Sequence, residues 1–284
     1  MRKPSFKILM ISVVAIAIAA FTACQEEYVI EEIAPTKSGN LLIRLTDAPF
    51  PTDLVAEASV TINKIEIHKM DDEQGPPFIV FSEEEQSFNL LDLTNGVTAI
   101  LADTAIESGF YKEIRLQVVD AYVKLKDSTL FDLKIPSGAQ SGLKVKINPS
   151  IEVDSALNAE LLLDFDVSKS FVVQGNPNTP AGIKGFNFNP VVKATIANAA
   201  GKLKGTVTDA NDNAIEGAQV SIIAADTVYT SSFTKENGKY VILGIDAGVY
   251  EVEFAKDGYA ATTIEDVEIK AKETTTLDAQ LDSE

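Results

Sequence analysis

The chain has 284 residues, of which 45% are hydrophobic and 23% are charged, as in globular domains and unlike disordered segments. This length fits about two domains. The formal net charge of -18 repels nucleic acid, so we exclude nucleic acid as a partner. The one cysteine excludes an intramolecular disulfide and a metal site built on several thiolates.

The first residues have the pattern of a secretory leader. The segment of residues 1–7 is short and basic, and residues 8–20 are apolar. Small residues then precede Cys24. The apolar run is shorter than the roughly 20 residues that a membrane-spanning helix needs. The position of Cys24 resembles the lipobox of bacterial lipoproteins, which implies a cleaved signal peptide over residues 1–23 and lipidation of Cys24. The alternative is an ordinary cleaved signal in which the cysteine is incidental.

The segment after this cysteine predicts where the chain is held. Residues 24–38 are polar and acidic, which is typical of a tether. Their acidic start, Gln25-Glu26-Glu27, resembles the surface-export signals of some outer-membrane lipoproteins. We therefore expect attachment to the outer membrane through the lipid anchor, with display on the cell surface. The alternative, the inner face of the same membrane, stays open.

From Gly39 onward the sequence alternates between apolar and polar residues, as strands do. Val60 and Ile62 alternate in one phase and Ile65 and Ile67 in the other, which predicts a β-bulge near Asn63 and Lys64. Residues 93–106 instead suggest a short helix with Thr94 as its N-cap. Further strands are expected over residues 114–119, 122–126, 130–135, 143–147, 160–167 and 186–196. Short strands separated by Gly and Pro turns predict a β-sandwich over residues 39–196.

A joint of small residues at 197–201 precedes a more regular series of strands. The pairs Asn237-Gly238 and Asp257-Gly258 are strong turn signals. Candidate strands cover residues 203–207, 218–223, 228–234, 240–243, 248–254 and 274–281. This series predicts a second sandwich over residues 201–284. The expected fold class is therefore all-β, with two β-sandwich modules in tandem after a lipoprotein signal peptide.

Both modules carry motifs of known families. The second contains Gly205-x-Val207-x-Asp209, Ile215-x-Gly217-Ala218-x-Val220, Gly238-x-Tyr240, Gly248-x-Tyr250-x-Val252-x-Phe254 and Gly258-Tyr259. It resembles the carboxypeptidase regulatory-like domain, a transthyretin-like sandwich. The resemblance implies a structural or binding accessory module with a fold related to carbohydrate-binding sandwiches. Asn213 and Ala214 stand where that family usually has Gly and Pro.

The first module contains Leu45-Thr46-Asp47-Ala48-Pro49, Leu90-Leu91-Asp92-Leu93, Gly109-x-Tyr111 and Asp164-Phe165-Asp166-x-x-Lys169-Ser170. It resembles an uncharacterised domain of bacterial outer-membrane lipoproteins, a domain of unknown function. This resemblance implies no biochemical activity.

Catalytic and cofactor motifs are missing from the sequence. His68 is the only histidine, so neither a Ser-His-Asp triad nor a two-histidine zinc site can be assembled. We expect it on the exposed face of its strand, beside Glu66. The chain has no P-loop and no GxSxG motif. We therefore predict no catalytic residues, no enzyme activity and no organic cofactor.

Carboxylates are the one abundant functional group. Asp164 and Asp166 lie two residues apart in an expected strand, so both point to one face, about 7 Å apart, and Asp47 is expected nearby. Such a set can bind calcium or serve a glycosidase. In the alternative, the acids cap turns or pair with the cations Arg44, Arg115 and Lys169. We expect the two arginines to pair with aspartates.

These features favour a non-catalytic cell-surface lipoprotein that displays binding or adhesion modules, with a glycan or a protein as the ligand. An alternative is a structural accessory subunit of an outer-membrane uptake or assembly complex. A remote alternative is a glycoside hydrolase that uses the paired aspartates. The chain has no Trp and only 7 Tyr, which counts against an aromatic sugar platform.

Overall fold

The computed structural model describes residues 37–48, 54–70, 78–156 and 158–284. Residues 37–284 form one compact unit. Cys24, the leader and most of the tether lie outside the described residues, so the predictions for them stay predictions. None of the helices in the described ranges has both the length and the apolar character needed to cross a membrane.

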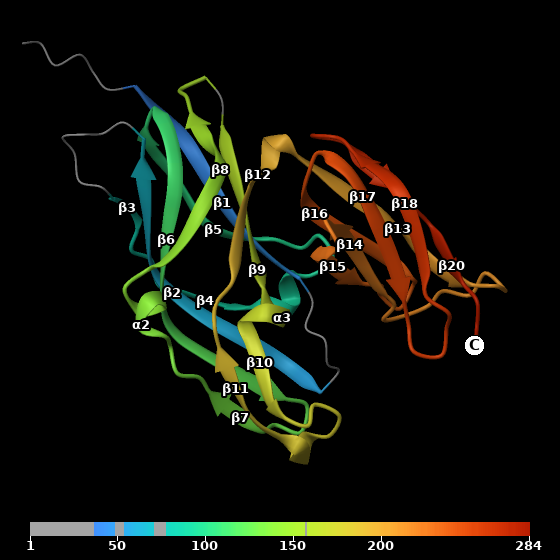
Figure 1. The fold of residues 1–284 in the computed structure, drawn as a ribbon. Helices are drawn as coiled ribbons and strands as arrows, with labels where there is room; N and C mark the ends of the chain where they lie inside the picture. Colours follow the sequence, from blue (N-terminus) through green and yellow to red (C-terminus); the bar gives the residue numbers. More distant parts are fainter. Residues whose placement is uncertain (1–36, 49–53, 71–77, 157) are drawn as a thin grey trace, which may run out of the picture. The chain divides into compact units, whose positions relative to one another are not determined.

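The first module consists of strands and a few very short helices (Figure 1). Its strands are β1 (Ser38–Ala48), β2 (Val55–Lys69), β3 (Ile79–Ser82), β4 (Gln86–Asn89), β5 (Ala99–Glu107), β6 (Gly109–Leu125), β7 (Leu130–Asp132), β8 (Leu143–Val153), β9 (Ala159–Asp166), β10 (Phe171–Gly175), β11 (Ile183–Phe188) and β12 (Val192–Ile196). Its helices are η1 (Leu90–Leu93), α2 (Ser137–Gln140), α3 (Val167–Ser170), η2 (Pro180–Gly182) and η3 (Ala197–Ala199).

Ten of these strands form one hydrogen-bonded sheet, and β10 pairs with β11 separately. The main path runs β3-β2-β6-β8-β12-β9-β1-β5, with β4 added to β2 and β7 added to β6. The link between β8 and β12 is a single residue pair, Ile147 with Ala194. The path therefore falls into two layers that meet at β8, and the core lies between them.

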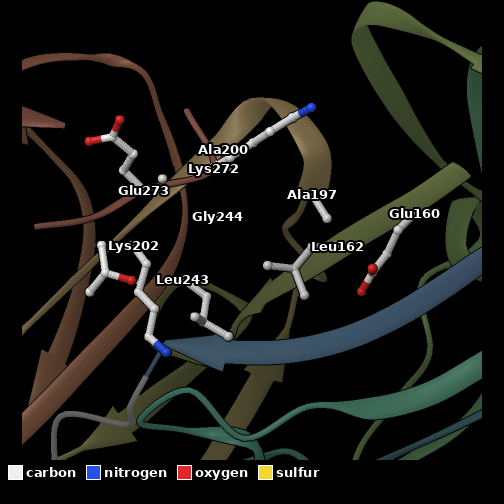
Figure 2. A pocket seen from close by; sticks show the side chains of 11 residues that line it. Glu160, Leu162, Ala197, Ala200, Lys202, Leu243, Gly244, Lys272 and Glu273 are labelled. Carbon is white, nitrogen blue, oxygen red and sulfur yellow. The ribbon is translucent and has the colours of Figure 1, made fainter. Parts of the chain in front are cut away.

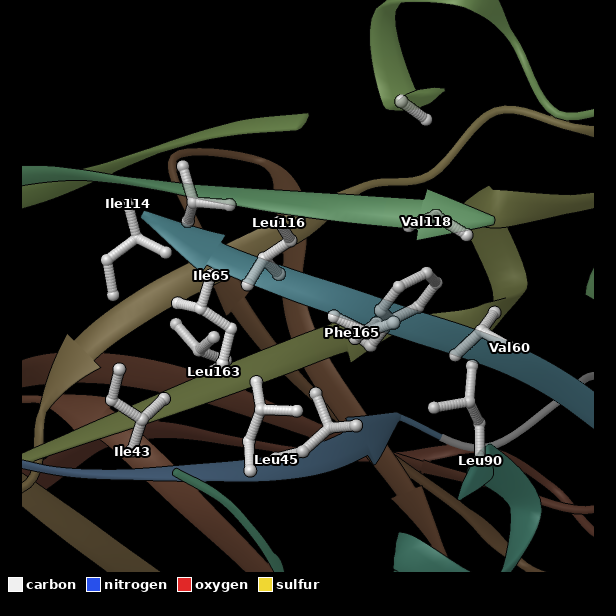
Figure 3. Packing of buried hydrophobic residues seen from close by; sticks show 14 of the residues in the cluster. Ile43, Leu45, Val60, Ile65, Leu90, Ile114, Leu116, Val118, Leu163 and Phe165 are labelled. Atoms are coloured by element: carbon white, nitrogen blue, oxygen red, sulfur yellow. The ribbon is translucent and has the colours of Figure 1, made fainter. Parts of the chain in front are cut away.

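The alternation of apolar residues explains which face of each strand is buried. Leu41, Ile43 and Leu45 of β1 are fully buried, whereas Leu42 and Arg44 between them are not. Figure 3 shows side chains of β1 and β9 facing those of β2 and β6, including Ile43, Leu45, Leu163, Phe165, Val60, Ile65, Ile114 and Leu116. Burial of such side chains supplies most of the stability of a sandwich, at roughly 25 cal/mol per Å² of apolar surface.

The predicted β-bulge is confirmed. The pairing of β2 with β6 shifts register between Ile62 and Lys64, so Asn63 is the extra residue. The insertion keeps Val60 and Ile62 on the same buried face as Ile65 and Ile67, although the two pairs are out of phase in sequence.

The predicted helix over residues 93–106 is wrong. Thr94 ends η1 as its C-cap, and Asn95 and Gly96 then turn the chain with φ angles of 56° and 78°. Ala99–Glu107 is strand β5, which pairs antiparallel with β1. Pairing with the edge of β1 overrides the weak local helix preference of this segment.

The second module is a sandwich of two four-stranded sheets. Its strands are β13 (Ala200–Asp209), β14 (Gln219–Ala224), β15 (Thr227–Phe233), β16 (Lys239–Asp246), β17 (Gly248–Ala255), β18 (Thr262–Ile269), β19 (Thr274–Thr276) and β20 (Ala279–Leu281). One sheet has the order β16-β13-β19 with β20 added to β13, and the other has the order β15-β14-β17-β18. Tyr240 and Phe254 are buried between them, with their rings 5.9 Å apart. The all-β prediction is confirmed for both modules.

Candidate functional site

Two of the three predicted calcium ligands have structural roles. Asp166 caps α3, because its carboxylate accepts hydrogen bonds from the backbone N–H of Lys169 at 3.0 Å and the hydroxyl of Ser168 at 2.6 Å. It also pairs with the Lys169 ammonium at 2.8 Å. Asp47 accepts a hydrogen bond from the backbone N–H of Val167 at 3.1 Å. These contacts are the capping and pairing roles that the sequence offered as the alternative.

Asp164 differs, because its carboxylate borders a small polar cavity. It borders a cavity of about 10 Å³ that Asp47, Asn95, Thr230 and Ser232 also line. Oδ1 of Asp164 is buried without a hydrogen bond, although the residue as a whole is only partly buried. Burial, followed by the negative charge of the neighbouring Asp166, raises the pKa of Asp164 to about 6. The cavity has room for about one water molecule.

Lys193 of β12 lies opposite Asp164 in register and connects the two modules. Its Nζ lies 3.3 Å from the centroid of the Tyr229 ring and 3.6 Å from Oδ2 of Asp246. Burial lowers the pKa of Lys193, while the charges of Asp246 and Asp164 oppose that shift. The buried ammonium of this partly exposed side chain thus holds the first module against β15 and β16 of the second.

Asn95, at the turn after η1, makes the most hydrogen bonds across the same contact. Its amide donates to the carbonyl of Phe233 at 2.9 Å, and its Oδ1 accepts from the Ser232 hydroxyl at 3.1 Å and the Val241 N–H at 3.3 Å. The next residue, Gly96, leaves no space for a side chain, since a Cβ would lie 2.7 Å from Val241. We call the set Asn95, Asp164 and Lys193 with its partners the module contact.

Beside the module contact lies a pocket of about 280 Å³, which we call the crease (Figure 2). Leu162, Ala197 and Leu243 point into it and form an apolar floor. Charged side chains of both signs, Glu160, Lys202, Lys272 and Glu273, stand around this floor. The crease is close in size to the smaller pockets that hold organic ligands.

Both predicted arginine–aspartate pairs are wrong. Arg44 pairs with Glu160, with its Nε 2.7 Å from the carboxylate. Arg115 packs its guanidinium against the ring of Phe78, 3.5 Å from the ring centroid. The sequence could not distinguish these outcomes, because both acids and aromatic rings attract guanidinium groups.

Asp47 and Asp164 line the same small cavity, whereas Asp166 caps the N-terminus of α3. In the described part of the chain, no group of three or more His, Cys, Asp or Glu side chains is placed to hold a metal. Calcium binding therefore stays a prediction. His68 lies on the outer face of β2, with its ring 4.9 Å from that of Phe78. Sequence reasoning missed Lys193 and Asn95, although the Asn95-Gly96 pair is a turn signal.

Comparison with solved structures gives only remote similarities. A type II cohesin–X-dockerin complex from Acetivibrio cellulolyticus is 20% identical over 28% of this chain and 56% of that chain, with a TM-score of 0.24. GBS52, the minor pilin of Streptococcus agalactiae, is 11% identical over 86% of this chain and 96% of that chain, with a TM-score of 0.25. The shaft pilin SpaA from Lactobacillus rhamnosus GG is 11% identical over 87% of this chain and 98% of that chain, with a TM-score of 0.26. These TM-scores do not identify a shared fold. The chain spans little more than half the length of the cohesin–dockerin protein.

Family models describe both modules. The model "Domain of unknown function (DUF4382)" matches residues 38–190, more than half of the chain. The model "Carboxypeptidase regulatory-like domain" matches residues 202–282. Neither description names a catalytic activity, and no curated protein matches the sequence. The chain therefore belongs to the DUF4382 family and carries a carboxypeptidase regulatory-like domain C-terminal to its DUF4382 domain.

Proposed function

We propose that this protein is a non-catalytic lipoprotein of the cell surface whose two modules present a ligand-binding surface. The observation that carries the proposal is the crease, an apolar floor ringed by charges of both signs. Glu160 is already neutralised by Arg44. The crease thus offers apolar and charged contacts for a glycan or protein segment.

The state of Asp164 supports the absence of catalysis. A carboxyl group with a pKa near 6 can act as a general acid at neutral pH. Here, however, the group faces a cavity of about 10 Å³, which is too small for a sugar ring. Its neighbour on the strand, Asp166, is engaged by Lys169 and by the first turn of α3.

Attachment of Cys24 to the outer membrane completes the proposal. Two or more acyl chains hold a protein stably on a bilayer, whereas one does not. The tether after Cys24 then separates the folded unit from the membrane, which leaves the crease accessible to ligands outside the cell. An accessory role beside an uptake complex uses the same anchor and the same surface.

The display half of the proposal is tested in cells. We expect mass spectrometry to find acyl chains on Cys24, and protease added to intact cells to remove the chain. The Cys24→Ser variant should leave the membrane fraction. A retained leader, or a chain that survives while other surface proteins are cleaved, contradicts the proposal.

The binding half is tested by filling the crease of the full-length protein. Ala197→Phe places a ring over the apolar floor, whereas Asn198→Phe adds the same ring at an exposed neighbour that does not line the crease. We expect glycans or proteins retained from the cell surface to be lost with the first variant and kept with the second, with and without calcium. Equal retention by both variants rules out the crease.

A further inference from the structure

Arg115 lies on the outer face of β6 in an unusual environment. Its guanidinium carbon is 3.5 Å from the centroid of the Phe78 ring, which also contacts His68. Gly142 lies close to its stem, since a Cβ there would be 3.3 Å from Cβ and Cδ of Arg115. The side chain is therefore held in place by packing before any ligand arrives.

This guanidinium has no polar partner within the described ranges. It makes neither a hydrogen bond nor an ion pair with the described residues, and its Nε is buried without an acceptor. Guanidinium donors are usually paired when they are partly buried, because an unpaired charged donor costs free energy. A packed arginine without a polar partner among the described residues is thus a group that a ligand can engage.

The charged residues on the strands next to Arg115 do not neutralise it. Lys144 of β8 is directly opposite Arg115 in register, and like charges in this position destabilise a sheet. On the other side, Glu66 of β2 is in register with Arg115 but forms its ion pair with Lys64, at 3.1 Å. Within the described ranges, neither Arg115 nor Lys144 therefore forms an ion pair with an acid, although the chain as a whole has a net charge of -18.

We propose that Arg115 and Lys144 bind a carboxylate group of an acidic polysaccharide. The planar guanidinium matches a carboxylate with two parallel hydrogen bonds, and the ammonium adds a second positive charge. Lys146 follows two residues later on the exposed face of β8, about 7 Å away. It can contact the next acidic unit of the same polymer.

The arrangement of strands favours a polysaccharide over an acidic peptide. His68, Arg115 and Lys144 come from three adjacent strands, so the ligand lies across the sheet face. A peptide that adds as a strand runs along a sheet edge. A peptide cannot add as a strand at Arg115, because β6 is already paired with β2 and β8. None of these residues lines the crease, so the site is a second one that goes beyond the proposed function.

The test uses full-length protein in neutral detergent and three polymers as probes. Polygalacturonate carries a carboxylate on each sugar, its methyl ester keeps the sugars without the charge, and polyglutamate keeps the charge on a peptide. We expect binding of polygalacturonate alone, and weaker binding at high salt. Preference for polyglutamate, binding of the ester, or no binding at all overturns the proposal.

Variants locate the site. Removing a charge-assisted bidentate contact with Arg115→Met should weaken binding roughly ten- to hundredfold, and Arg115→Lys should restore it only in part. Lys144→Gln should weaken binding while raising the melting temperature of the free protein, since it removes the repulsion from Arg115. A merely structural Lys144 predicts no loss of binding.

Lys184→Gln removes an exposed lysine elsewhere in the first module and serves as the control, with binding unchanged. Equal weakening by this variant indicates nonspecific attraction and overturns the site. The polymer assay uses purified protein, so a negative result in it would not contradict display of the protein on the cell surface. Failure of surface display likewise leaves the measured polymer affinity intact.

Discussion

At the residue scale, Asp164 and Lys193 show how burial acts on opposite charges at the module contact. Burial raises the pKa of the acid and lowers the pKa of the base, so each charged form is disfavoured. Lys193 has two further partners, the carboxylate of Asp246 and the ring of Tyr229, so its charge does not depend on Asp164 alone. The charge of Asp164 lies next to that of Asp166 and is therefore the less well compensated of the two.

We predict that Asp164→Asn stabilises the protein at neutral pH. The pKa of Asp164 rises from 3.8 to about 6 on folding, so the folded state binds the proton more tightly and stability falls as pH rises from about 4 to 6. Above pH 6 the variant should be more stable by on the order of 2 kcal/mol. Below pH 4 this gain should vanish.

Urea unfolding across this pH range measures the effect. Asp120→Asn makes the same chemical change at an exposed position and serves as the control. A gain that is equal at every pH would show that ionisation of Asp164 is not its source.

The sequence predicted the position of Asp164 on a strand face but not its surroundings. Its pKa is raised by burial and by the charge of Asp166, and Lys193 opposes this shift. Lys193 lies 29 residues further along the chain and is brought opposite Asp164 by the pairing of β9 with β12. Arg44 and Arg115 show the same limit, because the residues that they contact, Glu160 and Phe78, lie far from them in the sequence. Residue type indicates what a side chain can bind, whereas strand pairing decides what lies next to it.

At the element scale, the turn between η1 and β5 connects the fold to the module contact. Asn95 has a φ of 56°, a conformation that Asn tolerates better than most residues. The same residue then points its amide at β15 and β16. Asn95 thus both adopts the backbone conformation that the turn requires and forms hydrogen bonds to the second module.

We predict that Asn95→Gly destabilises the protein by about 1–3 kcal/mol, because it removes hydrogen bonds between the modules but keeps the backbone conformation. Asn95→Ala should cost about 1 kcal/mol more, since alanine resists a positive φ. Calorimetry should show one unfolding transition in the wild type separating into two in these variants. Unchanged transitions in both would mean that the turn contributes nothing to the contact.

Strands were predictable where burial on one side imposes a period of two. The bulge at Asn63 followed from a change of phase alone. The prediction failed for β5, which was assigned to a helix, and it missed four other strands, β3, β4, β10 and β18. Each of these strands pairs with only one other described strand, and that partner specifies it more than a strong local pattern does.

At the scale of the whole molecule, the outer face of β9 is part of the interior. Leu162 is 6% exposed, and a side chain on Gly244 of β16 would lie 2.9 Å from it. Thr195 on the neighbouring strand β12 is equally buried. The second module therefore covers a surface that the first module alone would leave open to solvent.

We predict that a chain ending at Ile196 keeps its strands but self-associates, because apolar surface left uncovered promotes association. Circular dichroism should be that of a β protein, while the hydrophobic dye ANS binds and the elution volume falls. Adding Leu162→Ser should reduce both effects. A truncated chain that stays monomeric and does not bind the dye would show that the face is stable without its cover.

The link at β8 has a consequence for how the first module comes apart. Between the two layers, one residue pair, Ile147 with Ala194, carries the backbone hydrogen bonding. Side-chain packing and a few polar contacts also hold the layers together, among them the hydrogen bond from the Gln86 amide to the Leu101 carbonyl at 3.1 Å and the Lys69–Glu107 ion pair at 2.8 Å. The packing weakens as soon as water enters. The module should therefore begin to unfold where β8 meets β12. In that event β8 stays paired with β6, and β12 stays paired with β9.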